Sequence, residues 1–251
     1  AGHLVRLSDR EPVRKLAWLQ CVGSREINRC DNKYCSSVCC MYAIKEALIA
    51  KEHIGAGFSG AVFHMDIRTH GKDFERYYDR ARAQGIRFIR SRIHSISKLD
   101  ETGTLTIGYV EESGRFVEEA FDMVVLSVGM EPASSAVALA RDLGIAITES
   151  NFVDTDDFLP VLTSRPGIYV AGVLQGCKDI PQSVTEASAA ACASATLLAG
   201  SRGQFIREKV FPEERDVRDQ TPRIGVFVCH CGTNIGGFAD VPGIAEYARS
   251  L

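Results

Sequence analysis

Hydrophobic and polar positions change period repeatedly along the chain, and the pattern predicts strands that alternate with helices. Short apolar runs indicate buried strands, whereas apolar positions three and four apart indicate helices. We expect strands over residues 15–22, 61–67, 86–90, 122–129, 167–172 and 223–229. We expect helices over residues 36–51, 72–84, 134–143, 181–199 and 242–251. This alternation favours parallel α/β layers.

Turn residues and charge divide this pattern further. Residues 97–120 alternate around turn residues, which predicts a small antiparallel meander. Pro181 fits the first turn of the expected helix 181–199, where proline is tolerated. The charged segment 202–223 carries Pro212 and Pro222, so we expect a linker there.

Composition narrows the class of protein. The 251 residues are 45% hydrophobic and 24% charged, with a net charge of −3 and a pI of about 6.1. Nucleic-acid binding would need a clustered basic surface, so this balance argues against it. No apolar run reaches the ~18 residues of a membrane span. The first residues lack the apolar stretch of a signal peptide, so we expect a cytoplasmic protein without a membrane span.

Cysteine changes this ordinary picture. The chain has nine cysteines, five of them between Cys21 and Cys40 and two more at Cys229 and Cys231. Without a secretory signal a disulfide framework is not expected. Clustered cysteines in a cytoplasmic protein indicate a metal or redox site.

The spacing of the first five cysteines suits a metal cluster. Cys35 and Cys39 share one face of the expected helix, and Cys40 points about a third of a turn away. Cys21 ends the preceding strand and can close such a site from the far side. Buried structural thiols are one alternative, but five in twenty residues is too dense for ordinary packing. Structural zinc is another, yet its ligands usually come as pairs on two knuckles, which a vicinal Cys–Cys unit fits poorly. The pattern favours iron–sulfur.

Several blocks of the chain closely resemble the A-subunit family of heterodisulfide reductases, which are iron–sulfur flavoproteins. The resemblance spans residues 1 to about 198. It is carried by Cys21-Val-Gly-Ser-Arg25, Tyr34-Cys-Ser-Ser-Val-Cys-Cys-Met-Tyr-Ala43 with Lys45-Glu46-Ala47, Asp66-Ile-Arg68 with Gly71-Lys72, Val125-Leu-Ser-Val-Gly129 and Gln175-Gly-Cys-Lys-Asp-Ile-Pro181.

The resemblance implies cofactors and a fold. It implies a [4Fe–4S] cluster held by Cys21, Cys35, Cys39 and Cys40 beside FAD, with Cys30 left over in a variable loop. It also implies a thioredoxin-reductase-like α/β fold of the two-domain FAD/NAD(P) type, in which the N-terminal half of the FAD domain is missing. The expected divisions are an FAD-domain segment with the cluster loop (1–54), a nicotinamide-domain-like insert (55–130), a returning FAD-domain segment (131–200), the linker (201–222) and the start of a second N-terminal-type domain (223–251).

Residues for the flavin follow from the same resemblance. They are Gly129, Gly172, Val173, Lys178, Asp179, Ile180 and Ser183, with Lys45 as a catalytic candidate that hydrogen-bonds flavin N5. A helix N-terminus near residue 181 would stabilise a reduced, anionic ring. The same lysine could equally be a solvated surface residue.

The chain departs from the family at three places. Val173 stands where many relatives have an aspartate that holds the ribityl chain, and Cys177 replaces a small residue or proline. No G-x-G-x-x-G follows a strand, so the pyrophosphate cradle is missing and we expect a piece of a longer protein. Residues 55–60 match that motif superficially, but they precede an expected strand.

The C-terminal segment carries two more cysteines, and the resemblance also implies a function for the chain. Residues 228–237, with Cys229 and Cys231, resemble the family's N-terminal domain, but two cysteines cannot complete a four-ligand site. The resemblance implies electron transfer between FAD and the cluster, with iron–sulfur, hydrogenase or ferredoxin-type subunits of a larger complex as partners, and electron bifurcation in the full-length protein. The alternatives are a non-catalytic iron–sulfur relay module and a structural zinc protein.

Overall fold

The computed structural model describes residues 4–98 and 104–251, and the chain forms two compact units. The first unit ends at Arg202 and the second begins at Gly203. This division falls close to the start of the expected linker. Within the described residues no helix combines the length and the apolar character that a membrane crossing needs.

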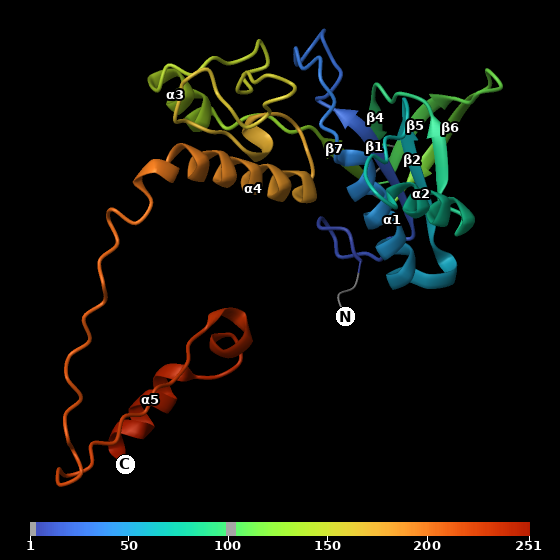
Figure 1. Cartoon of the computed structure of the whole chain (residues 1–251). Coiled ribbons are helices and arrows are strands. Elements are labelled where there is room, and N and C mark those ends of the chain that lie inside the picture. The colour runs from blue at the N-terminus through green and yellow to red at the C-terminus, as the bar shows by residue number, and fades with distance from the viewer. Residues whose placement is uncertain (1–3, 99–103) are drawn as a thin grey trace. The chain divides into compact units, whose positions relative to one another are not determined.

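The first unit is built on a four-stranded parallel sheet in the order β3-β2-β1-β7 (Figure 1). Its strands are β1 (Lys15–Val22), β2 (Ser59–His64), β3 (Arg87–Arg90) and β7 (Met123–Val128). β1 pairs with both β2 and β7. The expected domain boundary after residue 54 therefore lies between two strands of one sheet, and the boundary after residue 130 lies just beyond its last strand.

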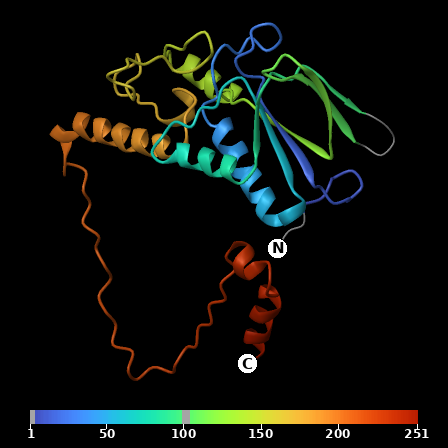
Figure 2. The same cartoon turned by 90° about the vertical axis from the view of Figure 1, so that its right-hand side faces the viewer.

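Both faces of the central strand β1 are buried, which explains its continuous apolar sequence. On one face Leu16 and Trp18 pack against α1 (Cys39–Ile54), and α2 (Phe74–Ala83) packs beside α1. On the other face Ala17 and Leu19 pack against the antiparallel sheet β4-β5-β6. Figures 1 and 2 show the two helices and this green sheet on opposite sides of the parallel strands.

The antiparallel sheet consists of β4 (Ile96–Lys98), β5 (Leu105–Val110) and β6 (Phe116–Phe121). It confirms the meander expected over residues 97–120, of which residues 99–103 lie outside the described part. Phe63 of β2 makes edge-to-face contacts with Tyr109 and Phe121 at ring-centroid distances of 5.0 and 6.0 Å. These aromatic contacts join the two sheets.

The rest of the first unit contains α3 (Ser134–Asp142) and α4 (Ile180–Leu197), joined by irregular chain. Ala140, Val153 and Val170 form a small core of their own. The strand expected over residues 167–172 is wrong: this apolar run forms a single β-bridge, Leu162 to Tyr169. The run is apolar because parts of it are buried, but a strand needs more than one paired residue.

The second unit contains α5 (Val241–Ser250), which confirms the helix expected over residues 242–251. A π-helical turn, Gly232–Gly236, precedes it. The strand expected over residues 223–229 is wrong, because the segment is irregular and its Ile224 and Phe227 side chains are 91% and 97% exposed. An apolar run forms a strand only beside a partner strand.

Candidate functional site

Cys21 lies in an irregularity at the carboxyl end of β1. The register between β1 and β7 shifts between Leu19 and Val22, and Cys21 adopts φ +59°. Such a bulge redirects one side chain out of the strand pattern. Cys39 and Cys40 are the first two residues of α1, which follows the loop. Strand end and helix start thus bring three cysteines to one place.

The thiols at this place interact with one another. The Cys21 thiol hydrogen-bonds the Cys39 thiol, which also contacts Cys40. Cys35 acts electrostatically on both Cys39 and Cys40. The structure therefore brings together the four cysteines that the resemblance implied as ligands. We name them the cysteine cluster: Cys21, Cys35, Cys39 and Cys40.

The backbone around the cysteine cluster is strained. The described residues contain seven non-glycine residues with positive φ, and four of them, Cys21, Arg25, Asp31 and Ser37, lie in this loop. Such conformations cost ~1–3 kcal/mol each and persist where the surrounding structure imposes them. Their concentration makes the loop a candidate functional site.

Positive charge and an N–H group face the cluster. Arg25 hydrogen-bonds the Cys21 sulfur and pairs with Asp66, which Arg68 also contacts at 3.4 Å. The Arg68 backbone N–H donates to Cys40. The Asp66–Arg68 block, which the resemblance singled out, therefore contacts the cysteine segment directly.

The thiols cannot all ionise by themselves. The hydrogen bond to Cys39, followed by burial, raises the pKa of Cys21 far above its usual value. For Cys39 the bond with Cys21 lowers the pKa, but Cys40 and burial raise it more, to about 11. The pKa of Cys40 is lowered, mainly by the hydrogen bond from Cys39. A bound cation would remove this conflict, because it stabilises every thiolate at once.

The cysteine cluster offers sulfur ligands, which both zinc and iron–sulfur clusters take. Across the described parts of the chain, no three side chains of His, Cys, Asp or Glu lie close enough to share one metal ion. Zinc needs four ligands around one centre, with Zn–S distances of ~2.3 Å. An iron–sulfur cubane is larger and takes one thiolate per iron, so its ligands stand further apart. The four cysteines of the cluster match the number of ligands that such a cubane takes.

Cys30 stays outside this group. It is exposed, whereas Cys21, Cys39 and Cys40 are buried. It does line the same hollow of ≈590 Å³ as Cys21, together with Arg29, Arg92 and His94. That Cys30 is the odd cysteine of the five stays a prediction.

The end of β7 is joined to the cysteine loop by a compact polar seam. Ser24 and Ser36, both fully buried, hydrogen-bond each other at 2.7 Å, and the Met130 N–H donates to Ser36 Oγ at 2.9 Å. Gly129 leaves no room for a side chain, since a Cβ there would lie 2.3 Å from Ser24 Oγ. Gly129 thus permits the close approach of β7 to the loop. Its expected contact with flavin stays a prediction.

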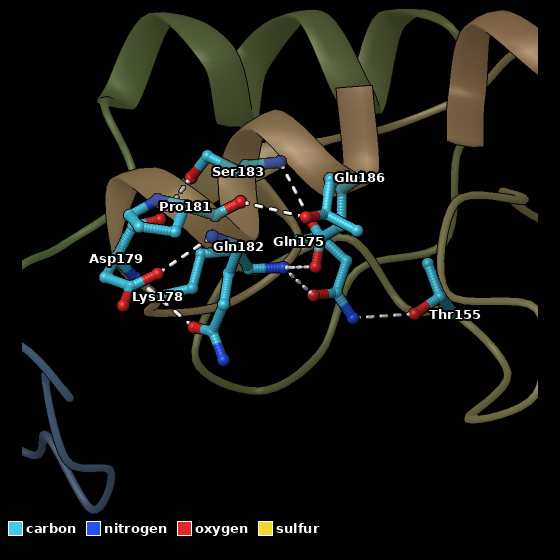
Figure 3. Close-up of polar contacts among 10 residues, drawn as sticks. Thr155, Gln175, Lys178, Asp179, Pro181, Gln182, Ser183 and Glu186 are labelled. Carbon is cyan, nitrogen blue, oxygen red and sulfur yellow. Dashed lines mark hydrogen bonds and ion pairs between the residues drawn. The ribbon is translucent and has the colours of Figure 1, made fainter. Parts of the chain in front are cut away.

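Three of the flavin residues expected after residue 171, namely Lys178, Asp179 and Ser183, are shown at the start of α4 in Figure 3. Asp179 Oδ1 accepts from the Gln182 N–H at 2.8 Å, and the Gln182 side chain accepts from the Asp179 N–H, which forms a capping box. Ser183 Oγ donates to the Asp179 carbonyl at 2.8 Å. Ile180 begins the helix and is 80% exposed.

Lys178 ties the start of α4 to a residue further along the same helix. Its buried ammonium contacts Gln175 and Glu186, as Figure 3 shows. The second Glu186 oxygen accepts from the Gly172 N–H at 2.9 Å. Gly172, with φ +74°, begins the 3₁₀ turn that contains Val173. Lys178 and Gly172 are therefore satisfied within the chain and hold the helix start in place.

Two residues lie elsewhere than their sequence position suggested. Lys45 is exposed and lines a hollow of ≈400 Å³ between α1 and α2, among Leu48, Tyr77 and Arg80, and the cysteine cluster does not contribute to that lining. Cys177, which has no expected role, interacts electrostatically with Cys35 and Cys39. In the sequence, Cys177 stands out only because the family has a small residue or proline at this position.

Comparisons with known proteins agree with the motifs. A family model described as pyridine nucleotide-disulphide oxidoreductase matches residues 61–191. The chain is 44% identical over 216 residues to an iron–sulfur A-subunit of the CoB–CoM heterodisulfide reductase of Methanopyrus kandleri, covering 84% of the chain and 32% of that relative. It is 42% identical over 214 residues to the A-subunit of the H₂/formate:CoB–CoM heterodisulfide, ferredoxin reductase of Methanococcus maripaludis, covering 83% and 32%. These relatives confirm the resemblance that the sequence motifs predicted.

The chain spans about a third of the length of these curated relatives. Among solved structures it is similar to thioredoxin reductase of Lactococcus lactis, with 22% identity, a TM-score of 0.47, and coverage of 75% of this chain and 53% of that one. The family match, together with the parallel sheet, confirms the expected α/β fold class of FAD/NAD(P) oxidoreductases.

Proposed function

Because the chain belongs to the pyridine nucleotide-disulphide oxidoreductase family, we propose that it transfers electrons between a flavin and a [4Fe–4S] cluster held by the cysteine cluster. The observation that carries this proposal is the convergence of four thiols from the end of β1, the following loop and the start of α1. The relative from Methanopyrus kandleri is named an iron–sulfur subunit, which supports the choice of metal.

The chain's own residues would tune the site. The cluster supplies one-electron transfer when bound. Arg25 and the Arg68 N–H offset the negative charge of the thiolates, and N–H groups that face cluster sulfurs are one of the means by which proteins set the reduction potential. Burial of Cys21, Cys39 and Cys40 keeps water from them.

The start of α4 fits one edge of a flavin. Pro181 has no N–H and Asp179 occupies the Gln182 N–H, so the Ile180 N–H is the first-turn donor available to a ligand. Together with the positive end of the helix it would stabilise an anionic flavin ring. The sequence provides no glycine-rich cradle for the pyrophosphate, so we expect FAD to bind weakly to this chain alone.

Partners and substrates are part of the same proposal. The relative from Methanococcus maripaludis is named as one subunit of a heterodisulfide and ferredoxin reductase. We propose that this chain likewise works with other redox subunits. The position of Lys45 between α1 and α2 gives no support to a contact with flavin N5, so we do not propose it.

Iron analysis tests the function. The anaerobically purified chain should hold about four irons and matching sulfide, as a cubane on four thiolates requires. Cys39→Ser should lose this iron, because Cys39 is buried and contacts both Cys21 and Cys40. Cys192→Ser, which changes an exposed cysteine of α4, is the matched control and should keep it. Zinc without iron and sulfide in the wild-type chain would refute the proposal.

A further inference from the structure

Cys177 comes from a distant part of the chain but reaches the cysteine loop through the Met130 peptide. Its sulfur lies 3.8 Å from the Met130 carbonyl oxygen. The same carbonyl accepts a hydrogen bond from the Tyr34 hydroxyl at 2.9 Å, and the Met130 N–H donates to Ser36 Oγ at 2.9 Å. Tyr34 and Ser36 are the two neighbours of Cys35 in sequence. The backbone of Met130 thus contacts Cys177 and both sequence neighbours of Cys35.

Cys35 is the most accessible member of the cysteine cluster. Cys21, Cys39 and Cys40 are 5%, 1% and 4% exposed, whereas Cys35 is half-buried, like Cys177. The Cys35 sulfur accepts a hydrogen bond from the Ser37 N–H at 3.3 Å, while the other three thiols contact one another. Cys35 is therefore the ligand that an incoming thiol can replace most easily.

The position of Cys177 is fixed from its other side as well. The next residue, Lys178, is buried and bound to Gln175 and Glu186. Asp179 then caps α4. Cys177 therefore lies between an anchored helix start and the Met130 carbonyl.

We propose that Cys177 is an alternative ligand for the iron atom that Cys35 holds. This inference rests on the proposed function. In the exchange the Cys177 thiol releases its proton and binds the iron, while the Cys35 thiolate leaves the iron and takes up a proton. Bonds, protons and charge balance, and no oxidant or reductant is needed. The exchange would let the cluster survive loss of its most exposed ligand.

Alanine substitutions of the whole chain test the proposal, because alanine, unlike serine, offers iron no oxygen ligand. Iron, sulfide and the electron paramagnetic resonance spectrum of the reduced cluster are measured anaerobically. We expect Cys35→Ala to keep most of its iron with a shifted spectrum, and to protect Cys177 from iodoacetamide. Cys35→Ala/Cys177→Ala should lose the iron, whereas Cys35→Ala/Cys192→Ala should behave like Cys35→Ala. Equal iron in the first two variants, whether kept or lost, overturns the proposal.

A second measurement decides the matter if Cys35→Ala fails to fold. Iron loss from the otherwise intact protein is followed in the presence of a chelator. Cys177→Ala should lose iron about tenfold faster than wild type, by analogy with other groups next to metal ligands, and Cys192→Ala should match wild type. Equal rates for Cys177→Ala and wild type overturn the inference alone. A wild-type chain without iron would instead refute the proposed function.

Discussion

Gly129→Ala tests the seam between β7 and the cysteine loop. The added Cβ would lie 2.3 Å from Ser24 Oγ, 2.9 Å from Ser36 Oγ and 3.3 Å from the Gly23 carbonyl oxygen. The first two contacts are too short for any real Cβ, and both serines are fully buried. The backbone of Gly129 has no positive φ, so the cost comes from overpacking and not from backbone strain.

The magnitude follows from two contributions. Overpacking a well-filled site costs ~1–3 kcal/mol. Moving the serines also weakens the Ser24–Ser36 bond and the bond from the Met130 N–H, at ~1 kcal/mol for a typical hydrogen bond. We therefore expect Gly129→Ala to lower the free energy of unfolding by about 2–4 kcal/mol. The substitution should also lower iron retention, because Ser36 follows Cys35 directly.

Urea unfolding of the purified chain measures this change. Gly176→Ala is the matched control, because a Cβ there meets nothing within 4 Å and Gly176 has no positive φ. Ser24→Ala removes the oxygen nearest to the added Cβ, so Gly129→Ala/Ser24→Ala should lose less stability than the sum of the single changes. If Gly129→Ala stays within about 0.5 kcal/mol of Gly176→Ala, a difference expected of neutral surface changes, the seam is not as tight as described.

Two further predictions concern buried charges. Lys178→Met leaves the Glu186 carboxylate without its cation, and both side chains are mostly buried, at 7% and 18% exposure. We therefore expect the free energy of unfolding, measured in urea, to fall by ~3 kcal/mol. Lys33→Met breaks an exposed pair with Glu149 and should cost less than ~1 kcal/mol; equal losses would contradict the burial argument. Burial raises the pKa of Glu119, but hydrogen bonds from Arg87 and Lys15 outweigh it, so this pKa lies below its ordinary value of 4.5. Stability from Glu119 is therefore fully present above pH 4.5 and is lost as pH falls through the lowered pKa. The stability difference between wild type and Glu119→Gln should shrink below pH 4.5, and a constant difference would show that Glu119 does not titrate as described.

The sequence allows single helices and strands to be predicted better than the pairing of distant strands. The apolar run at residues 15–22 and the helix after the cysteine loop could be predicted, because burial and helical period leave a local trace. The run at residues 167–172 looked the same but forms one bridge, since strand formation depends on a partner that the run does not encode. The pairing of β1 with β2 across the boundary expected after residue 54 is likewise a long-range property.

In the candidate site, too, residues close together in sequence could be predicted and a distant one could not. The four cluster cysteines could be found from spacing and resemblance, and the structure brings them together. Cys177 could not, because its approach to Cys35 depends on the Met130 peptide, 47 residues away in sequence. Lys45 follows Cys40 closely on α1, yet it lines a hollow with α2 because the helix turns it to another face.

The place of the cysteine cluster in the sheet explains why this fold can carry it. From β1 the chain proceeds to β2 on one side, and it returns to β7 on the other side. Open parallel sheets bind their ligands at such a switch point, outside the carboxyl ends of the strands, where the loops on either side diverge. Cys21 is the next-to-last residue of β1, Gly129 follows β7, and Cys39 begins the helix that crosses from β1 to β2. The general ligand-binding position of the fold is therefore occupied here by thiols instead of a glycine-rich loop. The sheet order places Cys21, Cys39 and Cys40 near this position, and the loop between them carries the positive φ angles of Arg25, Asp31 and Ser37.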